Sequence, residues 1–403
     1  MRGVMFALTG LGKPVRHALK WDAISAAIGG LSSGAMFPFL GVILRRDLDG
    51  SAYLIALLGA SFAVGNLFNP VMAHHIRSRV KLPYAVWPPV FSRAFFLLMP
   101  LAGTAPTFVG ITVMGCALGS LAAPGYAAVI RDAYPVERRG QLMGLVRVLF
   151  VGGSMLGALI GGFVLHALSY RWFFPMVALF GMAGSAAFSR IGVPAAPGAE
   201  TPTGGRVTDA FKIVAADRLF RIYSLAFFLH AFGNLILSPV LPIFQVDLMH
   251  ISNQWVAYLS MVASGLGMIG YLWWGRVLDR RGPFNLLLCV LGVASIGPLT
   301  YFLAGNVKVL LIAAAVQGFA GAGGDLAYVN AALRFARRDL VVSYVAVFAF
   351  LQAMRGIPAP FIGAALCNWL GPRPVFLVTL GLWAAAAAVA FAGMKLFRAA
   401  QAA

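Results

Sequence analysis

The sequence is short of charge, and of acidic charge above all. Only 11% of its 403 residues are charged, and 12 acidic residues stand against 31 lysines and arginines. A soluble domain carries about 25% charged residues, so this composition, with 61% hydrophobic residues, excludes an ordinary soluble fold. The net charge of +19 would suit a nucleic-acid partner. In so apolar a chain it more often marks cytoplasmic loops, and we expect a lipid bilayer as the partner and no nucleic acid.

Cysteine is also scarce, and the usual signatures of catalysis are missing. The three cysteines, Cys116, Cys289 and Cys367, lie in apolar runs without paired spacing, so neither a disulfide framework nor a metal site is indicated. The apolar runs hold no zincin pair, nucleophile elbow or paired carboxylates, and the chain has no nucleotide-binding motif. We therefore expect no enzymatic activity, no cofactor and no metal.

Long apolar runs are what the chain has instead. Each can cross ~30 Å of hydrocarbon as a helix, and together they predict an all-α membrane protein with twelve transmembrane helices in two six-helix bundles. The expected organisation is a lead-in at residues 1–20, a first bundle at 21–190, a proline- and glycine-rich linker at 191–218 and a second bundle at 219–398. The apolar runs fall at residues 21–44, 52–74, 83–103, 106–130, 141–168, 171–190, 219–246, 254–275, 284–304, 307–333, 340–367 and 373–396.

Basic residues gather on one side of the expected membrane. The N-terminus, the linker, the C-terminus and alternate loops carry most of them, whereas the opposite loops hold few. The positive-inside rule then places both termini and the linker in the cytoplasm. The opposite loops hold only Arg45, Arg46, Arg171, Lys308 and Arg373.

The two sets of runs look like copies of one another. Pro38 followed by Asp47 matches Pro239 followed by Asp247, and Tyr53 matches Tyr258, at an offset of about 200 residues. Parallel repeats of this kind build one class of secondary transporters, in which the substrate site lies between the halves near the bilayer midplane.

Four short motifs, in order along these runs, carry a resemblance to a known family. They are Gly275-Arg-Val-Leu-Asp279-Arg280-Arg-Gly282, similar to a loop signature G-x-x-x-D-R-x-G; Pro135-Val-Glu-Arg138-Arg139-Gly140, similar to P-x-x-x-R-G; Gly153-x-x-x-Gly157-Ala158-x-x-Gly161-Gly162, similar to an antiporter signature; and Tyr170-Arg171-Trp172-Phe173-Phe174, similar to the start of a sixth span. The chain thus resembles the major facilitator superfamily over nearly its whole length. It departs from the family at His74, Ala158 and Ile111, which stand where an aspartate, a proline and an arginine belong.

The resemblance implies a conformational latch on the cytoplasmic side. Asp279 is expected to approach the start of the fifth span, where a helix N-terminus and basic side chains favour an acid by roughly 0.3–1 kcal/mol. A static loop clasp is the alternative reading, and the two glycines of the signature suit a tight turn. The residues of the predicted latch are Gly275, Asp279, Arg280, Gly282, Arg138, Arg139 and Arg147.

Charges inside the apolar runs are the second candidate site. Asp325 is the acid placed well inside a run, and Arg355 lies inside the next one. Such residues are costly in lipid and usually face a partner or a wet cavity. Two readings stay open: a structural salt bridge between neighbouring helices, or a cavity in which Asp325 takes a proton or cation and Arg355 meets an anionic group. Arg93 is expected to have a structural role.

The resemblance also implies that the first, fourth, seventh and tenth spans line a central cavity. His230 and Asn234 are one helical turn apart and share a face. A membrane histidine is as often a plain contact between helices as a titrating group. The further candidates for substrate binding or coupling are Ser33, Phe37, Tyr126 and Gln317.

The function expected from the sequence is secondary active transport by alternating access. The solute is a small organic molecule, anionic or zwitterionic, and the protein an ion-coupled exporter of the cell inner membrane that works as a monomer, with protons or another ion as partner. A facilitated uniporter or uptake symporter of the same fold is the first alternative. A membrane-embedded partner or sensor without transport activity is the second.

Overall fold

The computed structural model describes residues 11–76, 79–135, 137–192, 216–335, 351 and 354–402, and within these ranges every regular element is a helix. The chain divides into two compact units. The first comprises Met1–Thr201 with Ser252–Met261, and the second Pro202–Ile251 with Val262–Ala403. The linker expected at residues 191–218 and the start of the run at 340–367 fall largely outside the described residues.

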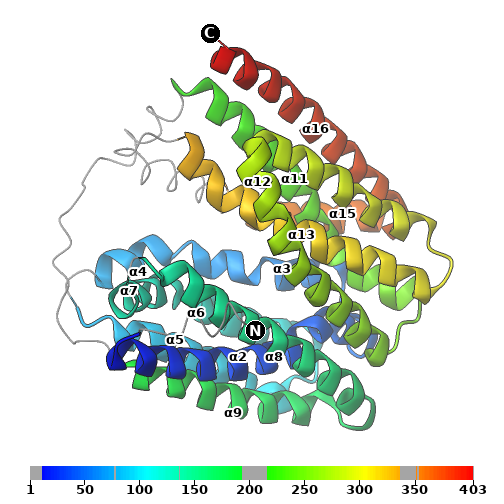
Figure 1. The fold of residues 1–403 in the computed structure, drawn as a ribbon. Helices are drawn as coiled ribbons and strands as arrows, with labels where there is room; N and C mark the ends of the chain where they lie inside the picture. The colour runs from blue at the N-terminus through cyan, green and yellow to red at the C-terminus, as the bar shows by residue number, and fades with distance from the viewer. Residues whose placement is uncertain are drawn as a thin grey trace. The chain divides into compact units, whose positions relative to one another are not determined.

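The helices of the first unit run close together, and α2, α8 and α9 lie side by side (Figure 1). The helix α2 begins at Lys13, eight residues before the expected span, so the second half of the predicted lead-in at residues 1–20 is helical. The elements are α2 (Lys13–Arg46), α3 (Ala52–Asn66), α4 (Asn69–Ile76), α5 (Leu82–Phe96), η1 (Met99–Leu101), α6 (Ala105–Ser120), α7 (Ala123–Ala133), α8 (Arg139–Ala167), α9 (Tyr170–Phe188) and η2 (Ser189–Ile191).

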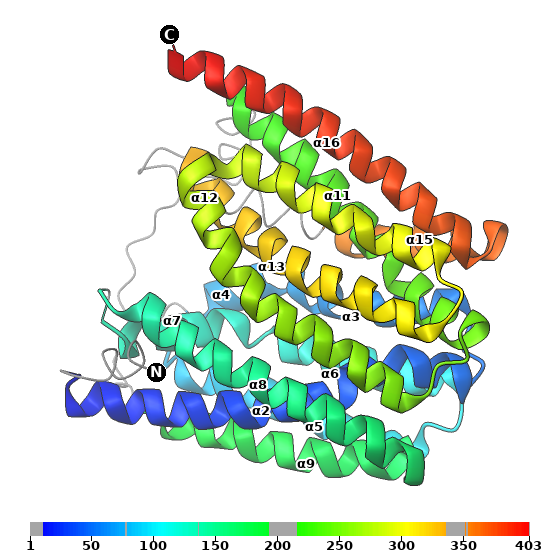
Figure 2. The same ribbon diagram turned by 45° about the vertical axis from the view of Figure 1, so that its right-hand side comes forward.

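The second unit is built around α12, which turns back on itself (Figure 2). The reversal is at Gly282, whose φ of 76° and ψ of 176° are open to glycine alone. The segment Gly275–Gly282, which resembles a loop signature, is therefore helical up to Gly282. The elements are α11 (Arg218–Ile243), η3 (Phe244–Leu248), α12 (Asn253–Leu303), η4 (Val307–Val309), α13 (Leu310–Phe335), α15 (Pro358–Leu370) and α16 (Pro372–Ala402).

Eight helices among the described residues are long and apolar enough to cross a membrane. One of them, Asn253–Leu303, contains two of the expected spans, and the shorter Ala52–Asn66 is also apolar. The all-helical membrane fold is thus observed, whereas the count of twelve spans stays a prediction.

Polar residues begin several of these helices. The side chains of Ser51, Thr104 and Ser169 each accept a hydrogen bond from a backbone amide in the first turn of the following helix. Asp217 does the same for the amide of Phe220 at 3.0 Å. The backbone amides of the first helical turn have no acceptor within the helix, so a side-chain oxygen that accepts from them stabilises the helix start. This stabilisation is largest where lipid excludes water, because no water can then act as the acceptor.

Glycines set the spacing of α2 and α8. A Cβ atom added at Gly157 would overlap the backbone carbonyl of Leu31, and one added at Gly34 would overlap that of Ser154. The two backbones therefore pass each other without side chains between them, which is a common way to pack helices in lipid.

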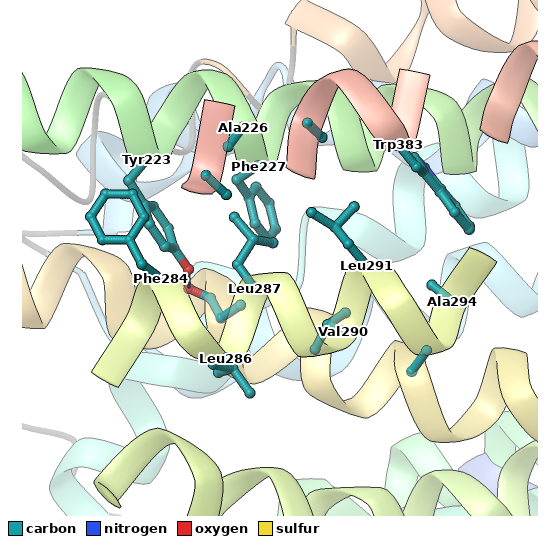
Figure 3. Close-up of a cluster of buried hydrophobic side chains, with 14 of the residues drawn as sticks. Tyr223, Ala226, Phe227, Phe284, Leu286, Leu287, Val290, Leu291, Ala294 and Trp383 are labelled. Carbon is teal, nitrogen blue, oxygen red and sulfur yellow. Dashed lines mark hydrogen bonds between the residues drawn. The ribbon is translucent and has the colours of Figure 1, made fainter. Parts of the chain in front are cut away.

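The second unit has its own core of apolar side chains. Figure 3 shows Phe227 of α11 and Leu287 of α12 among the buried residues, with Trp383 of α16 nearby. Tyr223, which is fully buried, donates a hydrogen bond to the backbone carbonyl of Ala327 at 3.0 Å. This core joins α11 to the second arm of α12, to α13 and to α16, and so forms one wall of the cavity described next.

Candidate functional site

A cavity of about 250 Å³ lies inside the second unit, between α11, α12, α13 and α16. Most of its wall is apolar or glycine, and the polar side chains that reach it are few. Apart from the rings of Tyr301 and Trp383 there are five of them, all from the sequence-predicted site, and four of the five lie on two helices. The polar residues are His230 and Asn234 of α11, Gln317 and Asp325 of α13, and Arg355, just ahead of α15.

His230 is one of the two buried polar groups of the cavity. Its side chain is only 6% exposed, and its Nδ1 atom has no hydrogen-bond partner among the described residues. The ring lies 5.2 Å from the ring of Trp383, which itself donates to the backbone carbonyl of His230 at 2.8 Å. A buried ring nitrogen without a partner costs free energy unless water or a bound molecule supplies one. The predicted pair with Asn234 does face the cavity.

Arg355 is buried beside the same cavity, with 6% of its surface exposed. Its guanidinium carbon lies 5.3 Å from the centre of the Phe227 ring, which is within the range of a cation–π contact. Such a contact helps to place the guanidinium at the cavity wall. Arg355 is thus one of the charged groups that line the cavity.

Asp325 has a partner that the sequence did not suggest. Its carboxylate accepts a hydrogen bond from the hydroxyl of Tyr271, on the first arm of α12. Asp325 is exposed and lines the cavity together with Arg355. Both charges thus line one cavity, and the choice between the two readings stays a prediction. Tyr271 was missed because one tyrosine in an apolar run carries no spacing signal.

The other predicted site residues lie in the first unit. Ser33 is half-buried, and Phe37 is 39% exposed and packs against Phe62 with ring centres 5.5 Å apart. Tyr126 donates to Asp22, a buried acid that the sequence reasoning missed. Asp22 was placed at the very start of the first span. Because α2 begins earlier than expected, this acid lies in its third turn.

Arg93 has the structural role expected of it. Its guanidinium donates to the hydroxyl of Ser185 at 3.0 Å and to the backbone carbonyl of Pro89 at 3.3 Å. The bond to Ser185 ties α5 to α9, whereas Pro89 belongs to α5 itself, and both bonds lie in the first unit, outside the cavity.

The predicted latch residues occupy two separate places. Asp279 and Arg280 are exposed on α12 just before the turn at Gly282. In the first unit, Arg138 is the residue just before the first turn of α8, and Arg147 places its guanidinium carbon 5.4 Å from the centre of the Phe150 ring. The contact between Asp279 and α8 would join the two units and stays a prediction.

Arg139, at the first position of α8, bonds within its own unit. Its guanidinium donates to the backbone carbonyls of Arg131 at 2.8 Å and Tyr134 at 3.2 Å. It therefore closes the turn between α7 and α8.

The two glycines of the loop signature are not equivalent, which gives a direct test. Gly282→Ala should lower stability by about 1–3 kcal/mol, because its backbone conformation excludes a side chain. The expected tight turn at Gly275 was wrong: this residue is helical, and a Cβ added there meets nothing within 4 Å. Gly275→Ala should therefore raise stability by up to about 1 kcal/mol through its helix propensity. Thermal unfolding in detergent measures both, and equal effects would contradict the assignment of the turn to Gly282.

Comparison with known proteins decides the family. Residues 23–357 match the family model of the Major Facilitator Superfamily. This chain belongs to the Major Facilitator Superfamily. It is accordingly a multi-pass membrane transporter and not an enzyme, as the sequence predicted.

A curated relative and several solved structures are similar to this superfamily member over most of its length. An uncharacterized MFS-type transporter of Bacillus subtilis, YuxJ, is 26% identical over 294 residues, which cover 70% of this chain and 73% of the relative. Among solved structures, the nucleoside transporter NupG superposes with a TM-score of 0.73 at 14% identity, covering 94% of this chain and all of that one.

A bacterial homologue of the human lysosomal transporter spinster, in an inward-facing and unoccupied conformation, superposes with a TM-score of 0.71 at 16% identity. The match covers 96% of this superfamily member and 98% of that chain. At these identities the structural likeness establishes the fold alone.

Proposed function

We propose that this chain is a secondary active transporter for a small organic solute, and that the cavity of the second unit forms part of its solute site. One observation carries the proposal: a deeply buried histidine nitrogen without a partner beside a buried arginine, in a cavity that is otherwise mainly apolar. Buried polar groups in lipid are costly, so their retention beside a cavity favours a ligand that satisfies them.

The solute class follows from the groups on the cavity wall. Arg355 suits an anionic group, and Asp325, held by Tyr271, suits a cationic group of the same solute or a coupling cation. Asn234 and Gln317 add amide donors and acceptors. This combination favours an anionic or zwitterionic molecule. The name of NupG makes a nucleoside a further solute to test.

The transport cycle we propose is alternating access. In this proposal the protein crosses the inner membrane of the cell twelve times as a monomer. Both of its termini lie in the cytoplasm. Ion-coupled export is the favoured mode, supported by the glycine pattern at Gly153–Gly162 that resembles an antiporter signature. A uniporter or an uptake symporter would use the same cavity, and a sensor that keeps the fold without transport would not need it.

Flux in reconstituted vesicles tests this function. Vesicles that contain the wild-type protein are loaded with a panel of carboxylates, amino acids and nucleosides. We expect the protein to exchange at least one labelled solute across the vesicle membrane, and an imposed pH gradient to drive accumulation of that solute. Asp325→Asn should lower this flux about tenfold, the cost of losing roughly 1.4 kcal/mol of a charge-assisted contact. The exposed acid Asp47, paired with its neighbour Arg46, supplies the control Asp47→Asn, which should transport normally.

The outcomes separate the alternatives. Exchange without any response to a pH or sodium gradient would indicate a uniporter. Absence of flux for all solutes, with no solute raising the melting temperature, would contradict transport and favour the sensor. Equal flux in Asp325→Asn and the wild type would remove this acid from the site.

A further inference from the structure

Asp22 is a buried acid that the cavity of the second unit does not use. It lies in α2 and only 2% of its surface is exposed. Ala18 and Leu19, on the preceding turn of the helix, belong to a cluster of apolar side chains that also takes in Val129 and Ile130 of α7. An ionised carboxylate in such surroundings is costly unless a cation pairs with it.

The partners of this carboxylate are two phenols. Tyr134 donates to Oδ2 at 2.7 Å, and Tyr126 lies 3.4 and 3.5 Å from the two oxygens. Tyr126 lies on α7 and Tyr134 is the residue that follows its last turn, so both phenols come from the same segment. Burial and the charge of Asp22 raise the pKa of Tyr134, which lies just beyond the end of α7, so this phenol stays a neutral donor.

No cation forms an ion pair with Asp22 in the part of the chain that the structure describes. Arg147 of α8 is close enough to act electrostatically on Tyr126. Lys81, where α5 begins, is held by Asp132 at 2.7 Å. Each of these charged groups thus acts on a group other than the Asp22 carboxylate.

The same holds for Arg190, in the short helix η2 that follows α9. Its guanidinium carbon lies 4.8 Å from the ring centre of Trp21, the residue that precedes Asp22. When Asp22 is ionised, the cluster of one carboxylate and two neutral phenols thus carries a negative charge that a proton would remove.

Tyr134 also connects this acid to the turn between α7 and α8. While its hydroxyl holds Asp22, its backbone carbonyl accepts a hydrogen bond from Arg139, the first residue of α8. The bond from a phenol to an ionised carboxylate is stronger than the bond to a neutral carboxyl. Loss of the charge therefore weakens the hold on Tyr134 and, through it, on the start of α8.

We propose that Asp22 is the binding site of a coupling proton, and that Tyr134 transmits its arrival to the α7–α8 turn. The proton adds to a carboxylate oxygen of Asp22 and leaves by the same route, with no other bond formed or broken. The inference rests on the proposed transport function, for which it names the coupling site. It also separates the roles of the two acids, since Asp325 lies at the solute cavity and Asp22 does not.

Infrared titration tests the proton site without knowledge of the solute. The protein in lipid vesicles is taken from alkaline to acidic pH, and the C=O stretch of a buried protonated carboxyl is followed. We expect one such band to appear in the wild type, to be lost in Asp22→Asn, and to be retained in the exposed control Asp47→Asn. Asp22→Glu, which keeps the carboxyl, should restore a band with a shifted midpoint.

A band unchanged in Asp22→Asn, or one that responds to sodium instead of pH, would overturn the proposal. Because no solute is added, such a failure would leave the transport function standing. Conversely, the protein could show an infrared band that depends on Asp22 but no flux of any solute. That result would contradict the proposed transport function and leave the protonation of Asp22 standing.

A fluorescent probe tests the transmission. Glu137, exposed in the α7–α8 turn, is replaced by cysteine after Cys116, Cys289 and Cys367 have been replaced by alanine, and the probe is attached there. Its emission should shift with pH at the midpoint of the infrared band. Tyr134→Phe should abolish this shift, and Tyr126→Phe, with its longer bonds, should reduce it less. A shift that persists unchanged in Tyr134→Phe would overturn the transmission step.

Discussion

Replacing Gly157 by alanine is expected to destabilise the protein by at least about 3 kcal/mol, the upper end for overpacking, because the added methyl overlaps backbone that cannot move aside. That backbone is the carbonyl of Leu31 on α2, with the amide of Ala35 close by. The measurement is the midpoint of thermal unfolding in detergent, together with the yield of folded protein.

Gly152 supplies the matched control on the same helix. A Cβ added there meets nothing within 4 Å, so Gly152→Ala should raise stability by about 0.5–1 kcal/mol through the helix preference of alanine. The two substitutions thus have opposite expected signs. Equal effects would show that the close approach of α2 and α8 does not hold in the membrane.

Replacing Arg355 by glutamine is expected to weaken the binding of an anionic solute by about 10- to 150-fold, the loss of a hydrogen bond to a charged group worth about 1.5–3 kcal/mol. Only 6% of the surface of Arg355 is exposed, so water has little access to stabilise the anionic group once the positive charge is removed. The solute found in the vesicle screen is titrated, and its effect on the melting temperature gives the dissociation constant.

Two further variants control for structure and for charge. Arg355→Lys keeps the charge without the planar fork and should recover part of the affinity. Arg398, exposed near the end of α16, supplies the control Arg398→Gln, which should bind as the wild type does. If Arg355→Gln bound the solute with unchanged affinity, the cavity would not be the solute site. An equal loss in Arg398→Gln would show that net charge, and not the site, is responsible.

Much of the fold could be predicted from local pattern because lipid leaves few choices. A run of apolar residues in a bilayer has to satisfy its own backbone, so it forms a helix wherever it falls. The helical pairing of His230 with Asn234 followed from the same regularity, since residues four apart share a face whatever surrounds them. The family motifs at Gly275–Gly282 and Pro135–Gly140 depend on residue order alone, and the family they indicated is confirmed.

The partners of the buried polar groups could not be predicted in this way. The sequence suggested Arg355 as a salt-bridge partner of Asp325. In the structure Asp325 accepts a hydrogen bond from Tyr271, 54 residues earlier in the chain. Asp22 was overlooked, and its phenols lie 104 and 112 residues later. Gly275 and Gly282 are both glycines of one signature, yet only Gly282 has a positive φ. In each case the deciding contact or angle depends on how the helices pack.

The sequence by itself determined that this protein is a helical membrane protein of the Major Facilitator Superfamily, because apolar length and motif order are properties of the linear chain. Only the tertiary structure decided which polar groups share a cavity and which acid is enclosed by phenols. Helix propensity and hydropathy say that a side chain lies on a helix in lipid. They do not say which neighbour it meets, because that is set by the packing of helices whose contacts are distant in sequence.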